Sequence, residues 1–113
     1  SRMKTNIKVA GTTFHPLPAG VGIKILEEVT VDNVPCARVQ GVLMPEPTNA
    51  YDSEAVAVYI PLKNGDAFHI GYIPAKEPIK GQITKNTLIE ILIKDYGQLG
   101  NYSPSFVITE INM

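Results

Sequence analysis

A short polar loop carries the residues of this chain that are best equipped for chemistry. Between Pro45 and Glu54, the residues Asn49, Tyr51 and Asp52 bring together an amide, an aromatic ring and a carboxylate. An amide and a carboxylate can hydrogen-bond a sugar or a base, and an aromatic ring can stack on a base. The set therefore favours a nucleotide-binding site, although Asn and Asp side chains also bond their own backbone in ordinary turns.

An apolar run follows this loop directly and must anchor it. Residues 55–60 read Ala-Val-Ala-Val-Tyr-Ile, which predicts a strand buried on both faces. The Asn-Gly step within residues 63–66 is typical of a tight hairpin, so residues 68–73 are expected to form the returning strand. Alternating or strongly apolar patterns predict the remaining strands at residues 7–10, 36–44, 88–93 and 106–111.

Other segments favour turns or short helices. The apolar residues of segment 21–29 fit one face of a short helix, although residues 23–25 also alternate like a strand. Residues 74–81 can hold one helical turn at most, because Pro78 interrupts the segment and Gly81 suits a C-terminal stop. Loops or turns are expected at residues 16–22, 32–33 and 97–104.

The sum of these elements is about six strands with one or two short helices, which predicts a mostly-β fold built as a small OB-like or SH3-like barrel. At 113 residues the chain is expected to form one domain over residues 1–113, and we expect Ser1 and Arg2, before Met3, to be cloning remnants. The composition, with 44% hydrophobic and 19% charged residues, is typical of a soluble globular protein.

Two further features bear on the compartment. The sequence contains no apolar run near the roughly 18 residues that a membrane span needs, and it begins with no signal-peptide pattern. The one cysteine, Cys36, cannot form an internal disulfide. We therefore expect a cytoplasmic protein that does not cross a membrane.

The charge balance limits the kind of nucleic acid that the chain can hold. Ten Lys and Arg residues stand against eleven Asp and Glu residues, for a formal net charge of -1. A broad electrostatic grip on duplex DNA is disfavoured, because such binders normally carry a basic surplus. A small pocket for one nucleic-acid end remains compatible with this balance, since a few local lysines can serve it.

The residues of common catalytic centres are scattered or absent. Cys36, His15 and His69 lie far apart in the sequence, so neither a metal nor another cofactor is expected, and Cys36 is expected to be a buried, inert thiol. No glycine loop of the phosphate-binding types is present. Asp52 and Glu54 could hold magnesium ions in a nuclease, but carboxylates that flank a turn are more often solvated caps. We expect no catalysis.

Three segments resemble a known family. Residues 9–14 (Val-Ala-Gly-Thr-Thr-Phe), residues 45–58 and residues 70–74 (Ile-Gly-Tyr-Ile-Pro) resemble the three signature blocks of the HIRAN domain, in their usual order. The middle block is similar to that family's Glu-Pro-x-Asn-Pro-Tyr-Asp-x-x-Ala-Val-x-Val pattern. The resemblance implies a modified OB-like barrel, a stand-alone bacterial or phage-type member, and capture of the 3′-hydroxyl end of single-stranded DNA.

The resemblance also implies roles for single residues. Asp52 would accept the hydrogen bond of a free 3′-hydroxyl, Asn49 would serve the sugar or base, and Tyr51 would stack on the terminal base. Phe14 would add a second stacking face, and Tyr72 would line the pocket. The expected DNA-binding residues are Thr13, Phe14, His15, Asn49, Tyr51, Asp52, Tyr72, Lys76 and Lys80.

Two positions depart from the family pattern. Ala50 replaces the proline that usually stands between the Asn and the Tyr, and Thr13 stands where the best-known end-binding members have an arginine. The leading hypothesis is a noncatalytic module for DNA repair, replication or phage DNA processing, with a DNA-processing ATPase or nuclease supplying any activity in trans. The alternative, favoured by Thr13 and the near-neutral charge, is a protein-interaction barrel without DNA-end binding.

Overall fold

Antiparallel strands make up most of this protein, and they confirm the predicted mostly-β class. The computed structural model describes residues 1–18, 20–94 and 104–113. Within them the only helical segments are two 3₁₀ turns, η1 (Thr12–Phe14) and η2 (Pro78–Gln82). The strands are β1 (Arg2–Lys8), β2 (Glu27–Val31), β3 (Val34–Pro45), β4 (Val56–Pro61), β5 (Ala67–Tyr72), β6 (Thr87–Lys94) and β7 (Ser105–Asn112).

The strands form one sheet whose two ends are not joined by a ladder. Its path runs β1-β7-β6-β3-β4-β5, and β2 pairs only with β3. The two ends of the path meet at a single antiparallel bridge between Ala10 and Tyr72. Among the described residues the sheet has seven strands where about six were predicted, and it does not close into a barrel.

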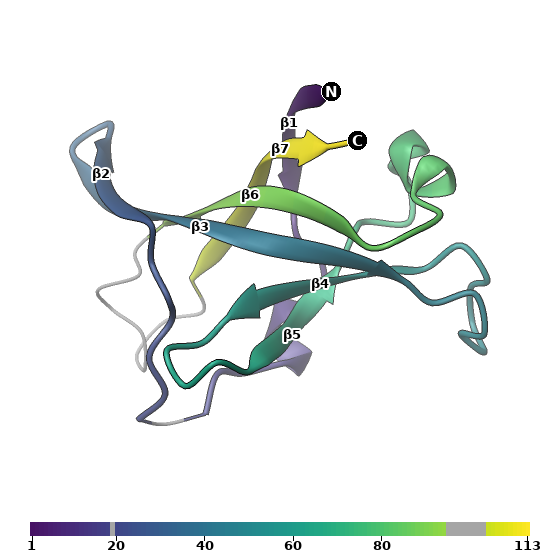
Figure 1. Ribbon diagram of the computed structural model, residues 1–113, viewed down its shortest axis with the longest axis horizontal. Helices are drawn as coiled ribbons and strands as arrows, with labels where there is room; N and C mark the ends of the chain where they lie inside the picture. The colour runs from purple at the N-terminus through teal and green to yellow at the C-terminus, as the bar shows by residue number, and fades with distance from the viewer. Residues whose placement is uncertain (19, 95–103) are drawn as a thin grey trace.

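The long strand β3 organises the sheet, because it pairs with β2 and β6 and, through its last residues, with β4. Figure 1 shows its length: the β2–β3 hairpin lies at one end, and the 46–55 loop and η2 lie at the other. Branched apolar side chains on the inner face of the sheet form the buried core, as is typical of an antiparallel sheet with one face in the core and the other in solvent. Its largest fully buried side chains include Leu43, Ile60, Ile70, Ile91, Ile93, Ile108 and Ile111.

The predicted short helix over residues 21–29 is wrong. Ile23 forms an isolated bridge with Leu62, and residues 27–31 form β2 against the start of β3. Asp32 and Asn33 make the expected turn, with φ angles of 51° and 64°, which suit a two-residue hairpin. The apolar spacing fits both structures, and the pairing with β3 decides between them.

The backbone settles two smaller predictions, and a third falls largely outside the described residues. The 3₁₀ turn η2 begins at Pro78 instead of being interrupted there, because proline has its φ preset for a first helical turn. The β4–β5 hairpin forms as predicted, with Pro61 paired to Ala67 and a longer loop than a two-residue turn. Of the predicted loop 97–104, residues 97–103 lie outside the described residues.

Two findings concern burial. Cys36 is fully buried, as predicted, and its thiol lies 3.5 Å from the carbonyl oxygen of Val34. In the described part of the chain, no helix is long and apolar enough to cross a membrane.

Candidate functional site

The 46–55 loop is held in shape by Asn49. The side-chain oxygen of Asn49 accepts hydrogen bonds from the backbone N–H groups of Tyr51 (2.9 Å) and Asp52 (3.1 Å). Its amide nitrogen donates to Glu46 Oε1 at 3.0 Å. At the base of the loop, the Glu46 N–H donates to the carbonyl oxygen of Ala55 at 2.8 Å. Because the loop backbone is bonded in this way, the Tyr51 side chain projects into solvent and is 98% exposed.

Asp52 connects the loop to η2. Its Oδ2 is bonded to the ammonium group of Lys80, and its Oδ1 accepts a hydrogen bond from the Glu54 N–H at 2.9 Å. The bond from Lys80, and next the bond from the Glu54 backbone, lower the pKa of Asp52. Asp52 is therefore a firmly ionised carboxylate. Its side chain is 38% exposed, so oxygen lone pairs remain open to a further donor.

Tyr72 connects the same loop to β5. Its hydroxyl donates to Glu46 Oε1 at 3.0 Å, the same oxygen that receives the Asn49 amide. Burial, followed by the hydrogen bond to Glu46, raises the pKa of Tyr72. Tyr72 is thus a protonated donor at neutral pH, and Glu46 joins the loop to the sheet.

A β-bulge shapes the sheet beside Tyr72. Along β5, Gly71 pairs with Val58 while His69 pairs with Tyr59, so the register shifts between these pairs. In a regular strand, residues three apart point to opposite faces. The bulge re-aims His69, and its ring lies 4.8 Å from the Tyr72 ring and 4.9 Å from the Tyr59 ring, measured between centroids.

The segment after β1 packs against β5 and brings η1 to this cluster. Ala10 and Tyr72 exchange two backbone hydrogen bonds, each of 2.9 Å. The close approach depends on Gly71, because a Cβ atom there would overlap the carbonyl oxygen of Ala10 and come within 2.9 Å of Val9 Cγ1. Gly11 then turns the chain with a φ of 74°, and Phe14 at the end of η1 is 84% exposed. In Figure 1, η1 lies beside β5.

The structure brings most of the sequence-predicted residues together. Asn49, Asp52, Tyr72 and Lys80 are joined through hydrogen bonds that include Glu46 and the loop backbone. His15 joins this set through its ring, 6.3 Å from that of Tyr72. The side chains of Thr13, Phe14, Tyr51 and Lys76 are exposed. Lys80 differs from these, since its side chain is only 11% exposed and its ammonium group faces Asp52.

Three residues of the site were missed at the sequence level: Glu46, Tyr59 and His69. Glu46 stands inside the middle signature block, so its position could have drawn attention to it. The contribution of His69 depends on the bulge in β5, and Gly71, an isolated glycine inside this strand, is the sequence signal that could have indicated it.

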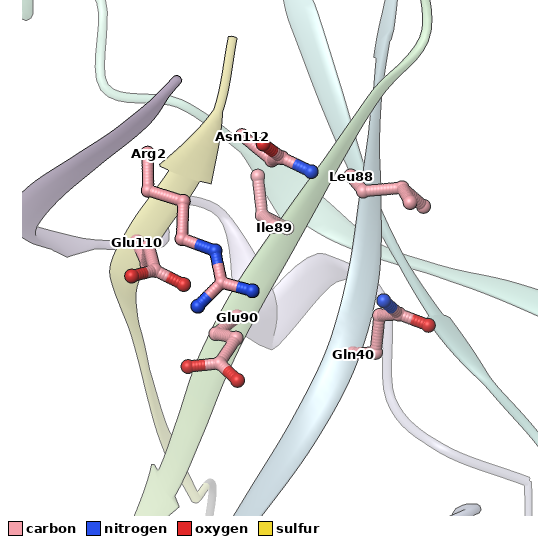
Figure 2. A pocket seen from close by; sticks show the side chains of 7 residues that line it. All are labelled: Arg2, Gln40, Leu88, Ile89, Glu90, Glu110 and Asn112. Atoms are coloured by element: carbon pink, nitrogen blue, oxygen red, sulfur yellow. The ribbon is translucent and has the colours of Figure 1, made fainter.

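A pocket of about 80 Å³ lies elsewhere on the sheet and contains none of the predicted site residues (Figure 2). Side chains from β1, β3, β6 and β7 line it, and Figure 2 shows the Arg2 guanidinium pointing toward Glu90 and Glu110. Glu90 is also bonded to Arg38, so both guanidinium groups near this pocket already face carboxylates, which makes the pocket a poor site for a phosphate. Its other lining residues are Gln40, Leu88, Ile89 and Asn112.

Comparison with known proteins identifies a family match that includes the residues around the 46–55 loop. The family model described as "HIRAN domain" matches residues 4–78 of the 113-residue chain. These residues include the 46–55 loop, β5 and η1. No curated protein and no solved structure gives a significant match. The family match supports a nucleic-acid-binding module with a DNA-related function.

Proposed function

The chain belongs to the HIRAN domain family, and on this premise we propose that its 46–55 loop captures the 3′-hydroxyl end of single-stranded DNA. The family match itself supports DNA-related nucleic-acid binding, and the proposal adds which strand and which end are bound. The observation that carries it is the pairing of a fully exposed ring, Tyr51, with an ionised carboxylate, Asp52, on one ordered loop.

Tyr51 is suited to stack on the terminal base. Its ring is exposed to solvent, and its backbone N–H is already held by Asn49. Binding therefore costs little additional conformational entropy of the loop. Stacking of a base on an aromatic side chain is typically worth about 1 to 3 kcal/mol and tolerates any base. Phe14, also exposed, supplies a second ring from the neighbouring η1 segment.

Asp52 is suited to sense a hydroxyl group. A carboxylate can accept a hydrogen bond from a free 3′-hydroxyl group, whereas the negative charge of a terminal phosphate would repel it. The bond with Lys80 keeps Asp52 ionised and fixes its direction. Preference for a 3′-hydroxyl over a 3′-phosphate follows from this chemistry.

The proposed module is noncatalytic. A magnesium-dependent nuclease at this loop would use the carboxylates of Asp52 and Glu54. The Asp52 carboxylate is already paired with the ammonium group of Lys80, which disfavours magnesium binding there. A DNA-processing ATPase or nuclease would then supply activity in trans, in DNA repair, replication or phage DNA processing. As part of the same proposal, the protein acts in the cytoplasm.

Fluorescence anisotropy with labelled oligonucleotides tests the proposal. Three probes of one sequence would carry a 3′-hydroxyl, carry a 3′-phosphate, or be circular with no free end. We expect binding to the first probe and at least tenfold weaker binding to the other two. A tenfold difference corresponds to roughly 1.4 kcal/mol of binding free energy. Tyr51→Ala should weaken binding by about 5-fold or more, because it removes the stacking ring.

Matched variants make the titration specific. Tyr51→Phe keeps the ring and should retain affinity, whereas Asp52→Asn should reduce the preference for the hydroxyl over the phosphate. Gln40→Ala, at the pocket of Figure 2, should change nothing. Equal affinity for all three probes would contradict end capture. No affinity for any probe would favour the protein-interaction alternative, and magnesium-dependent cleavage would favour a nuclease.

A further inference from the structure

Two histidines lie against each other beside the proposed end-binding loop. The ring centroids of His15 and His69 are 4.3 Å apart, with an angle of 44° between the ring planes. His15 directly follows the exposed Phe14, and His69 packs against Tyr72, whose hydroxyl bonds the Glu46 carboxylate of the loop. Both histidines are half-buried, so part of each side chain faces solvent.

The hydrogen bond of His69 fixes where its proton sits. Its Nε2 lies 2.8 Å from the carbonyl oxygen of Gly71, and a carbonyl oxygen can only accept, so Nε2 carries the proton. Nδ1 of the neutral ring therefore carries none. Protonation of the ring adds a second N–H group and a positive charge at this place.

The groups that face His69 come from four parts of the fold: His15 after η1, Tyr59 on β4, Tyr72 on β5 and Glu46 after β3. Burial lowers the pKa of His69 most, and the nearby His15 lowers it further, while the Gly71 carbonyl and Glu46 act in the opposite direction. The ring is thus neutral at neutral pH, with a carboxylate near enough to favour its charged form.

The carboxylates of the hydrogen-bonded cluster outnumber its one lysine. Lys80 is already bonded to Asp52, so Glu46, Asp52 and Lys80 together carry one net negative charge. Each nucleotide of a strand brings a phosphodiester anion. The two rings touch, so an anion can reach only their solvent-facing edges, where it would favour the charged form of His69 and offset the repulsion between two charged rings.

We propose that His15 and His69 form a protonation-dependent contact for a backbone phosphate of the bound strand, so that affinity for single-stranded DNA rises as the pH falls. The inference rests on the proposed function, since it assigns regulation to the same site. By linkage, a complex that takes up one proton can gain at most about tenfold in affinity for each pH unit.

Anisotropy titrations with the 3′-hydroxyl oligonucleotide at about pH 6, 7 and 8, at constant ionic strength, test this contact. We expect the wild-type affinity to be about tenfold higher at pH 6 than at pH 8. His15 and His69 are the only two histidines of the chain. The variants His15→Gln and His69→Gln should each reduce this difference, and the double variant should abolish it.

An NMR titration of the His69 ring gives a second readout that needs no variant. Addition of the oligonucleotide should raise the pKa of His69, because a nearby anion favours the charged ring. An unchanged ring titration, or a pH dependence that survives in the double variant, would overturn the contact. Binding that does not vary with pH would refute this inference alone, whereas no binding at any pH would refute the proposed function as well.

Discussion

At the scale of single residues, the site depends on side chains that each make more than one bond. Glu46 Oε1 accepts from both Asn49 and Tyr72, and the two oxygens of Asp52 accept from Lys80 and the Glu54 backbone. Removal of one partner leaves a polar group without its bond in a partly buried place, which usually costs more than the bond itself contributes. We therefore expect changes at these residues to alter the loop as a unit.

The Asp52–Lys80 pair gives a prediction about charge. The pKa of Asp52 is lowered, so the pair stabilises the fold above the ordinary carboxyl pKa of about 3.9 and loses this effect as the pH falls through the lowered value. Lys80→Met should raise the pKa of Asp52 toward its ordinary range, because the first cause of the shift is removed. Carboxyl ¹³C NMR titration measures this, with Lys76→Met as the control.

Lys76 suits this control because its side chain is exposed and lies in the same stretch of chain. An Asp52 titration that is identical in wild type and Lys80→Met would show that the ion pair does not form in solution.

The sequence was informative about some of these residues and silent about others. Asn49 and Asp52 could be identified because turn-forming side chains bond backbone groups two or three positions away. Asp52 and Lys80 are 28 positions apart, and Glu46 and Tyr72 are 26 apart. Such pairs depend on how the strands are arranged in space, and no local pattern encodes them.

At the scale of elements, β5 and the segment that crosses it hold the two halves of the site together. The 46–55 loop reaches β5 through Glu46 and Tyr72, and η1 reaches it through the Ala10–Tyr72 bridge. Phe14 and Tyr51 come from segments far apart in the sequence: η1, which carries Phe14, contacts β5, whereas the Tyr51 backbone is held by Asn49 within the loop.

Gly71 gives a prediction at this scale. Gly71→Ala should destabilise the fold by about 1 to 3 kcal/mol, because its new methyl group would overlap the Ala10 carbonyl oxygen and force the backbone apart. Chemical denaturation measures the loss. The same change should weaken DNA binding, since the crossing segment carries η1.

Gly22→Ala is the matched control for this glycine. Its added methyl group would meet only the side chain of Lys63, which is flexible and can move aside. An equal loss of stability in both variants would show that the close approach at Gly71 does not limit the fold.

The strands that were predicted correctly share strong local signals. The apolar run before the β4–β5 hairpin and the alternation in β3 each point to one structure. β2 was missed because Val21, Ile25 and Val29 also fit a helical face, and only the pairing of Val29 with Cys36 on β3 decides the matter. The bulge in β5 was missed although Gly71, an isolated glycine within the strand pattern, is a local signal for one; its place is set by the pairing with β4.

At the scale of the whole molecule, the charge balance restricts how a strand is bound. The formal net charge is -1, and the lysine nearest the proposed hydroxyl sensor is already paired. Binding should therefore depend on stacking and on a few hydrogen bonds, with one or two phosphate contacts at most. This differs from a protein that follows the DNA backbone along a basic groove.

The salt dependence of binding tests this restriction. For single strands, the logarithm of affinity falls with the logarithm of salt by about 0.7 for each phosphate contacted, so we expect a slope between about -0.7 and -1.4. Anisotropy titrations over a range of salt concentrations give the slope. A slope steeper than about -4 would indicate six or more phosphates and a broad cationic surface.

The central claim is that the 46–55 loop, with η1 and β5, is where the strand end sits. The most direct measurement is a ¹H–¹⁵N NMR titration of the whole chain with a short 3′-hydroxyl oligonucleotide. The amide signals of Phe14, Tyr51 and Asp52 should shift most, and the 3′-phosphate oligonucleotide should shift them less. Shifts confined to the pocket of Figure 2, around Gln40, Glu90 and Glu110, would contradict the claim.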